Sequence, residues 1–104
     1  MNLNKYENFF GDSAEKEKNI EDWNDFDFVL SKVKQKGWSL YDASKKLTNN
    51  EKIVLEAVKQ DGLALKFASK RLQDNEDVVQ EAINQNVIAL KYASYNFQKE
   101  FLYK

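Results

Sequence analysis

The stretch EDWNDFDF, Glu21 to Phe28, comes closer than any other part of the chain to a site for chemistry. It combines four acids with aromatic side chains. Carboxylates are ligands that Ca²⁺ prefers, but an EF-hand loop also needs a glycine at its sixth position and a glutamate at its twelfth. Counted from Asp22, the fifth position is Phe26 and the sixth is Asp27. The pattern therefore argues against a metal site, and no metal ion or other cofactor is expected.

Two interpretations of this stretch stay open. Acids at the start of a helix favour its dipole and cap its free amides, while the aromatic rings close the end of a core. Alternatively, the acids and the tryptophan form a patch that binds a partner protein. The candidate partner-binding residues here are Glu21, Asp22, Trp23, Asp25 and Asp27.

The chain lacks the side chains on which conventional catalysis most often depends. The 104 residues include no histidine and no cysteine, so the commonest general base and the thiolate nucleophile are both missing. No glycine-rich phosphate loop is present, and the chain is not expected to be an enzyme. The lysines at 32, 34 and 36 favour a solvated helix face, because the sequence pI of about 5.5 is far below that of a typical nucleic-acid module.

A 25-residue repeat accounts for most of the chain. Its three ungapped units are residues 25–49, 50–74 and 75–99. The second and third units agree at 12 of 25 positions, and the first and second at 11 of 25. The stretch ALKFAS (64–69), for example, returns as ALKYAS (89–94). Tandem similarity at a fixed period is typical of repeat architectures.

Each unit carries two apolar stripes with helical spacing. The first stripe joins Val29, Val54 and Val79 to Val33, Val58 and Ile83, four positions further on. The second stripe comprises Leu40, Leu65 and Leu90, then Ala43, Ala68 and Ala93, then Leu47, Leu72 and Phe97. The expected helices are 26–36 and 39–47, 51–61 and 63–72, and 76–86 and 88–100.

Residue types at the element boundaries support this division. Gly37 and Gly62 lie between the stripes, where a left-handed residue would end the first helix. The predicted N-caps of the first helices are Asn24, Asn49 and Asp74. The three repeated serines, 44, 69 and 94, are expected to bond to a carbonyl four residues earlier or to a neighbouring unit. The third unit has Val87 in place of the glycine, which suggests a different turn there.

The predicted fold class is all-α, with three tandem 25-residue helical hairpins stacked as a short α-solenoid, because a lone hairpin cannot bury its apolar face. Residues 1–24 form an acidic N-terminal segment, in which a short helix near residues 3–10 and a loop are expected. Residues 25–104 form the repeat domain with a C-terminal extension. The first unit has Asp42 where the others carry aromatic rings, and Lys32 where they carry alanine, so this face of it is expected to meet solvent.

The repeat resembles a known family. The pattern N-x-E-x-I-V-x-x-A-V-x-x-x-G-x-A-L-x-x-A-S-x-x-L in residues 49–72 is similar to a short tandem repeat that is catalogued only as a domain of unknown function. The resemblance covers residues 25–99 and is weakest in the first unit. It implies a helical-repeat fold and brings no activity, cofactor or catalytic residue with it.

The C-terminal stretch adds aromatic side chains beyond the repeat. Tyr95 aligns with two lysines and should lie outside the core. Phe101 and Tyr103 follow the last unit, where they either cap the open end of the stack or contact a partner. Tyr95, Phe101 and Tyr103 are therefore further candidate partner-binding residues.

Charge is divided unevenly along the chain. Residues 1–27 hold eight acids and three lysines, a net charge of −5, whereas residues 28–104 hold nine acids and thirteen basic residues, a net charge of +4. Such a split is compatible with an acidic segment that packs near the basic body or competes for it. The N-terminus lacks the apolar core of a signal peptide, and no membrane span is present, so a cytoplasmic location is expected.

The leading functional hypothesis is a non-enzymatic protein–protein interaction module with a protein partner. One alternative is a small acidic inhibitor from a phage or mobile element, similar in profile to anti-CRISPR proteins, that binds a nucleic-acid-handling effector. Another is a structural repeat fragment or a scaffold that forms a homo-oligomer. Direct binding of nucleic acid is not favoured.

Overall fold

The computed structural model describes residues 21–102, and within that range the chain is helical and has no strand. The helix expected near residues 3–10 and the loop after it lie outside this range, as does Tyr103. Each unit consists of a ten-residue α-helix, a six-residue 3₁₀-helix (η) and a short α-helix. The elements are α2 (Phe26–Gln35), η1 (Gly37–Asp42) and α3 (Lys45–Thr48); α4 (Glu51–Gln60), η2 (Gly62–Phe67) and α5 (Lys70–Gln73); α6 (Glu76–Gln85), η3 (Val87–Tyr92) and α7 (Tyr95–Leu102).

The second helix of each unit is not continuous, so the expected helices 39–47, 63–72 and 88–100 are wrong as single elements. A 3₁₀-helix ends at an extended alanine, and the serine after it is also extended where it caps a new α-helix, as at Ser44 and Ser69. The Ser69 hydroxyl accepts a hydrogen bond from the Leu72 amide at 3.2 Å. These serines therefore interrupt the helix because they satisfy the first free amides of the next one.

The long helices begin at the predicted residues, 26, 51 and 76, but their N-caps lie one residue later than predicted. Their N-caps are Asp25, Asn50 and Asn75, whose side chains accept from the backbone amides three residues further on at 2.8, 3.1 and 3.0 Å. Asn24, Asn49 and Asp74 are therefore not the caps. Adjacent residues with similar amide or carboxylate groups made the two positions hard to separate in the sequence.

The prediction of left-handed glycines is wrong, because neither Gly37 nor Gly62 has a positive φ. Instead, a Cβ atom at Gly37 would collide with the carbonyl oxygen of Ala57, and one at Gly62 with that of Ala82. The glycines thus let the next unit approach closely. Val87 keeps the same turn, with an extended residue before a 3₁₀-helix, so the different turn expected there is also wrong.

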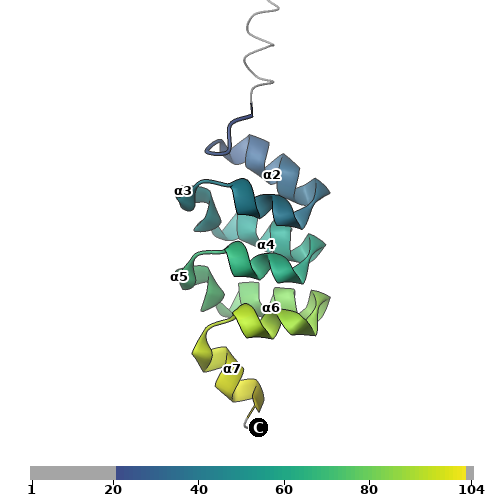
Figure 1. The fold of residues 1–104 in the computed structure, drawn as a ribbon, viewed down its shortest axis with the longest axis vertical. Coiled ribbons are helices and arrows are strands. Elements are labelled where there is room, and N and C mark those ends of the chain that lie inside the picture. The colour runs from purple at the N-terminus through teal and green to yellow at the C-terminus, as the bar shows by residue number, and fades with distance from the viewer. Residues whose placement is uncertain (1–20, 103–104) are drawn as a thin grey trace, which may run out of the picture.

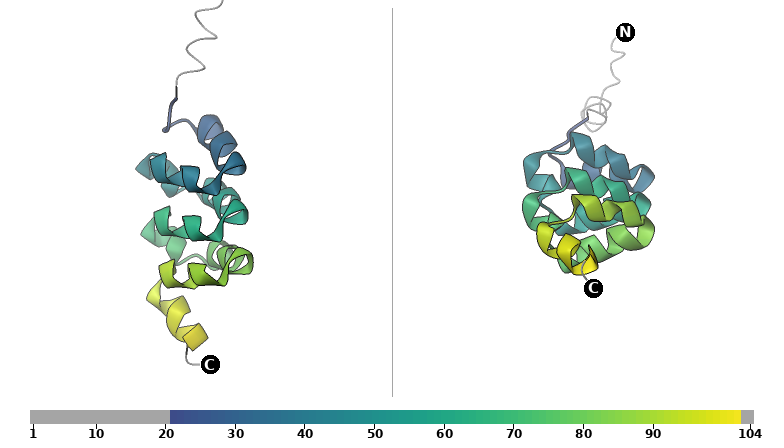
Figure 2. Two further views of the ribbon diagram at one scale, coloured as in Figure 1. Left: turned by 45° about the vertical axis from the view of Figure 1, so that its right-hand side comes forward. Right: turned by 60° about the horizontal axis from the view of Figure 1, so that its bottom comes forward.

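The units stack in chain order, as Figures 1 and 2 show. Helix α4 packs between α2 and α6, and η2 between η1 and η3. The core is built from the predicted stripes, and its largest fully buried side chains include Leu40, Leu47, Leu65 and Leu72. Every helix in the described range is too short or too polar to span a bilayer.

A hydrogen bond between backbones links each unit to the unit or segment before it. The amides of Ser44, Ser69 and Ser94 donate to the carbonyls of Trp23, Thr48 and Gln73, at 2.8, 2.9 and 2.8 Å. The spacing of these donors is the repeat length, so the two joints between units and the contact of the first unit with Trp23 use the same backbone atoms. We call these three bonds the rungs.

Side chains reinforce the joints. The Ser69 hydroxyl donates to Asn49 Oδ1 at 2.7 Å, and the Ser94 hydroxyl donates to Asp74 Oδ1 at 2.6 Å. Of the two partners expected for these serines, the neighbouring unit is therefore confirmed. Arg71 also donates to the Asn49 side chain and to its carbonyl.

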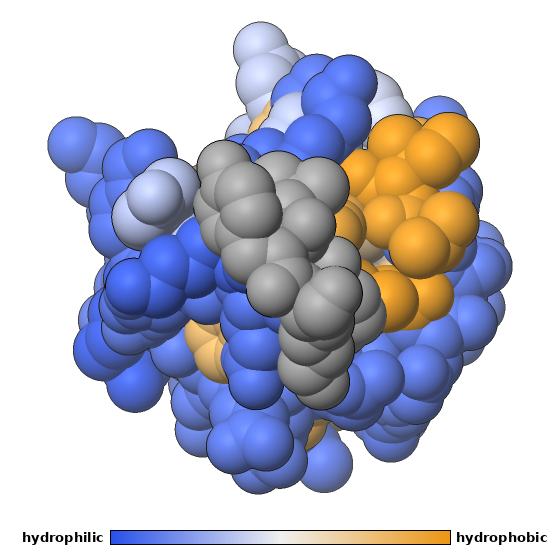
Figure 3. Space-filling model, turned by 90° about the horizontal axis from the view of Figure 1, so that it is seen from below, coloured by the Kyte–Doolittle hydropathy of each residue, from blue (hydrophilic) through white to orange (hydrophobic). Residues whose placement is uncertain are grey.

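The two ends of the stack differ. In the first unit Asp42 is exposed, as predicted, whereas Lys32 is half-buried over the ring of Phe28. In the third unit Val87 and Ile88 remain 66% and 56% exposed, because no further unit in the described range covers them. Figure 3 shows apolar surface on the molecule seen from below.

Candidate functional site

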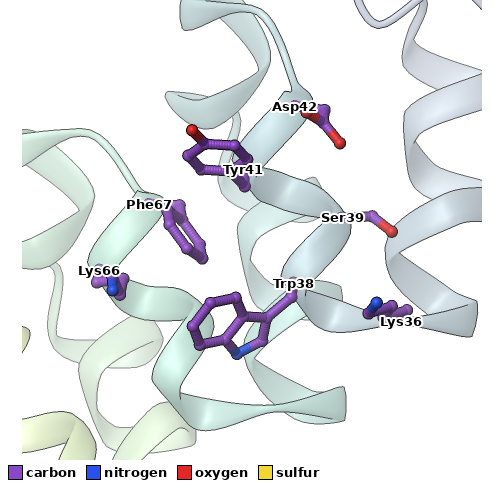
Figure 4. Close-up of a pocket in the computed structure, with 7 residues that line it drawn as sticks. All are labelled: Lys36, Trp38, Ser39, Tyr41, Asp42, Lys66 and Phe67. Carbon is purple, nitrogen blue, oxygen red and sulfur yellow. The ribbon is translucent and has the colours of Figure 1, made fainter.

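A surface pocket of about 420 Å³ lies across the first two 3₁₀-helices. Figure 4 shows Trp38 and Tyr41 on η1 facing Phe67 on η2. The residues that line it are Lys36, Trp38, Ser39, Tyr41, Asp42, Lys66 and Phe67. We refer to this pocket as the aromatic groove.

The 3₁₀ geometry brings the two aromatic side chains of η1 together. With three residues per turn, side chains three apart lie above one another, so Trp38 and Tyr41 share one edge of the helix. Phe67 packs against both, with its ring centroid 4.9 Å from Trp38 and 5.2 Å from Tyr41, edge to face in each case. Such pairs fix ring orientation, and the three rings therefore form an ordered apolar surface.

Charged groups border the groove. The Lys66 Nζ atom lies 5.2 Å from the centroid of Trp38, 5.3 Å from that of Phe67 and 5.7 Å from that of Tyr92 in the third unit. Cations at such distances are attracted to the ring faces. Lys36 lies on the other side of Trp38, and Asp42 lies toward the Tyr41 end (Figure 4). An incoming group would thus meet rings flanked by two ammonium groups and one carboxylate.

Sequence reasoning missed the groove, although the repeat held a signal for it. Trp38 aligns with Leu63 and Ile88, so it looked like one more apolar residue of a helix. Tyr41 aligns with Lys66 and Lys91, which shows that its position faces outward. The groove could have been predicted from this signal, which is an aromatic residue at an outward-facing position that is aromatic in one unit only.

The arrangement is suited to binding an apolar or aromatic side chain. The groove contains a serine hydroxyl, two lysines and a carboxylate, but no histidine or cysteine exists to activate a nucleophile. Rings that are both ordered and exposed are instead typical of surfaces that hold another apolar or aromatic side chain.

The structure places the predicted acidic residues at the start of the stack. Asp25 caps α2, and the Asp22 side chain accepts from the Asn24 amide at 3.0 Å. Trp23 is half-buried and packs edge to face on Phe28, with ring centroids 5.1 Å apart. Two of the five candidates thus serve the local fold through their carboxylates, and Trp23 serves it through its ring.

The other two acidic candidates are exposed. Glu21 accepts a long hydrogen bond, 3.4 Å, from the Trp23 indole, and Asp27 lies on the outer surface of α2. Across residues 21–102, no three carboxylates come together in a group that could hold a metal ion.

Of the C-terminal candidates, Tyr95 lies in the third unit and Phe101 follows it. Tyr95 is 69% exposed at the start of α7, with Lys99 Nζ 5.7 Å from its ring centroid. The backbone of Phe101 lies in the last turn of α7, and Tyr103 is outside the described residues. Tyr95 lines a second surface pocket, to which Lys66 of the aromatic groove also contributes.

The repeat matches a known family model. This model, described as a domain of unknown function (DUF4116), matches residues 25–73 and again residues 50–98. The two matches start 25 residues apart, which is the repeat length read from the sequence. The chain belongs to this family. No curated protein and no solved structure matches it.

Proposed function

We propose that the chain is a non-enzymatic protein-interaction module, in which a short α-solenoid holds the aromatic groove open to a peptide segment of a partner protein. Each of the three 25-residue units contributes one layer. The observation that carries the proposal is the exposure of Trp38 and Tyr41 beside Phe67.

The scaffold supports this role because its joints are regular. The same rungs and the same glycine contacts hold the first unit to the second and the second to the third. Stacked repeats of this kind form extended surfaces on which adjacent units present side chains side by side. The groove lies on such a junction, with η1 on one side and η2 on the other.

The exposed rings have no structural need to be aromatic. Tyr41 is 70% exposed and Trp38 is 38% exposed, whereas Leu63 and Lys66 stand at the same positions of the second unit in an equivalent fold. Tryptophan and tyrosine are enriched among the residues that dominate binding energy at protein interfaces. Their presence in the first unit alone therefore favours a binding role.

A peptide fits the groove better than nucleic acid does. Binding to nucleic acid relies on many phosphate contacts, and such domains usually have a pI above about 9. The pI of this chain is about 5.5. Lys36 and Lys66 are enough to pair with one or two carboxylates beside an apolar side chain, which is the pattern of a short acidic peptide.

Capture from the native cell tests the proposal. The tagged full chain is compared with the variant Trp38→Ser/Tyr41→Ser, and Ile88→Ser serves as a control because Ile88 stands at the position of Trp38 in the third unit and is 56% exposed. We expect the parent and the control to retain a stoichiometric protein that the groove variant loses. Circular dichroism should show the same helicity for all three chains.

Equal recovery of the partner by the groove variant would overturn the proposal. If the chain recovers only further copies of itself, the module is a homo-oligomeric scaffold instead. The inhibitor hypothesis stays a prediction, and it assigns binding to the acidic patch of Glu21, Asp22, Asp25 and Asp27 instead of to the aromatic groove. Reversal of Asp22, Asp25 and Asp27 to lysine should abolish inhibition of a nucleic-acid-handling effector if that hypothesis holds.

A further inference from the structure

We infer that the aromatic groove is a self-docking site, filled by the N-terminal stretch YENFFGD (residues 6–12) of the same chain until a partner peptide replaces it. This inference rests on the proposed function, because it names the class of peptide that the groove takes. That class is a short acidic segment with aromatic side chains.

The chemistry of the segment complements that of the groove. Residues 6–12 hold three rings, Tyr6, Phe9 and Phe10, and two carboxylates, Glu7 and Asp12. The groove offers Trp38, Tyr41 and Phe67 as an apolar surface, with lysine ammonium groups on both sides of the indole. Aromatic pairs contribute beyond the area that they bury, and each carboxylate can pair with one of the lysines.

The charge of the whole chain favours the same contact. Residues 6–12 hold two acids and no basic residue, a net charge of −2, whereas residues 28–104 carry +4. At ordinary ionic strength such opposite charges attract over about 8–10 Å, so the segment is drawn toward the basic part of the stack rather than away from it.

The point where the segment joins the stack is close to the groove. The Trp23 carbonyl accepts from the Ser44 amide at 2.8 Å, and Ser44 lies only two residues beyond Asp42, which lines the groove. Twelve residues separate Phe10 from Trp23. They span up to about 40 Å when extended, so the connection is long enough.

Covalent attachment makes a modest intrinsic affinity sufficient. A segment tethered by a short linker has an effective concentration of the order of millimolar at its site. A groove that binds the free peptide weakly is therefore mostly filled by the tethered copy. A partner must compete with that copy, which makes the N-terminal segment a built-in inhibitor of the module.

Fluorescence of the full chain tests the inference. The substitution Trp23→Phe leaves Trp38 as the sole tryptophan. In that background we compare the parent with Tyr6→Ser/Phe9→Ser/Phe10→Ser, and use Lys16→Ser/Lys18→Ser as a control in the same N-terminal region. We expect acrylamide to quench Trp38 more strongly in the triple variant than in the other two chains.

A synthetic peptide of residues 4–12 supplies the second measurement. It should bind the triple variant about ten-fold more tightly than the parent, because the tethered competitor has been removed. Unchanged quenching together with equal peptide affinity would overturn self-docking. Quenching in the parent that depends on protein concentration would assign the occupant to a second copy and overturn docking within one chain.

The experiments distinguish failure of self-docking from failure of the proposed function. If the peptide binds neither chain but the partner is still lost in the groove variant, self-docking fails while the interaction module stands. If the peptide binds and no partner requires the groove, the docking site stands without the proposed function.

Discussion

Asn49 and Asn50 are neighbours with different partners. Asn50 caps α4, whereas the Asn49 side chain accepts from Ser69 and Arg71 in the joint between the first and second units. A cap affects the start of one helix, but a joint residue links two units. The consequences of losing the two amides should therefore differ in kind.

Double-mutant cycles distinguish the two roles. Asn50→Ala should lower the free energy of unfolding by about 1 kcal/mol whether or not Arg71 is present. Asn49→Ala should couple to Arg71→Leu by at least about 0.5 kcal/mol, because the two side chains touch. Urea denaturation gives both quantities. Coupling of Arg71 to Asn50 instead would contradict these assignments.

At the scale of the element, the glycine before each joint decides how closely two units approach. Gly62 begins η2 against the carbonyl of Ala82, and its amide donates to Gln85 Oε1 at 2.6 Å. Val87 occupies the same position in η3, where no unit in the described range packs on it. The two positions thus form a natural pair for comparison.

Substitution by alanine should destabilise the chain at Gly62 and have little effect on stability at Val87. Gly62→Ala adds a methyl group against backbone that cannot rotate away, and should destabilise the chain by about 1–3 kcal/mol. Val87→Ala removes atoms that are mostly exposed, and should change stability by less than about 0.5 kcal/mol. Thermal unfolding of both variants checks this. Similar losses at both positions would show that the close contact is not what requires glycine.

The sequence predicted the units, the register and most of the buried stripes, because burial repeats with helical spacing. It did not predict the break before Ser44, since Leu40, Ala43 and Leu47 fit one α-helix as well as two shorter helices. The role of Gly62 was missed because the obstructing carbonyl belongs to Ala82, twenty residues further on. The exposed position of Trp38 was missed because it aligns with Leu63 and Ile88, and a tryptophan that aligns with aliphatic residues is equally consistent with a place in the core.

For the whole molecule, the described layers have unequal numbers of neighbours. The second unit is covered on both sides, and Leu65 is fully buried, whereas the aligned Leu90 of the third unit is partly exposed. In a stack held by contacts between adjacent layers, the outer layers open first. The stability of a segment should therefore depend on its place in the stack.

Native-state hydrogen exchange should show this dependence of local stability on position in the stack. The amides of α4 and η2 should exchange most slowly, and those of α7 should exchange at least about ten-fold faster, since a difference of 1.4 kcal/mol in opening free energy is a factor of ten. Amide NMR in deuterated buffer resolves the individual sites. Uniform protection across the three units would mean that the stack opens only as a whole.

The rungs also have a consequence for the duplication of a unit in the gene. Each joins a serine amide to an earlier backbone carbonyl, which for Ser69 and Ser94 lies in the preceding unit, and all three use the same atoms at the same interval. An in-frame duplication of the middle unit would therefore create a joint that already has its glycine, its serine and its acceptor. Lengthening by copying would need no compensating mutation, and the aromatic groove at the first joint would be inherited intact.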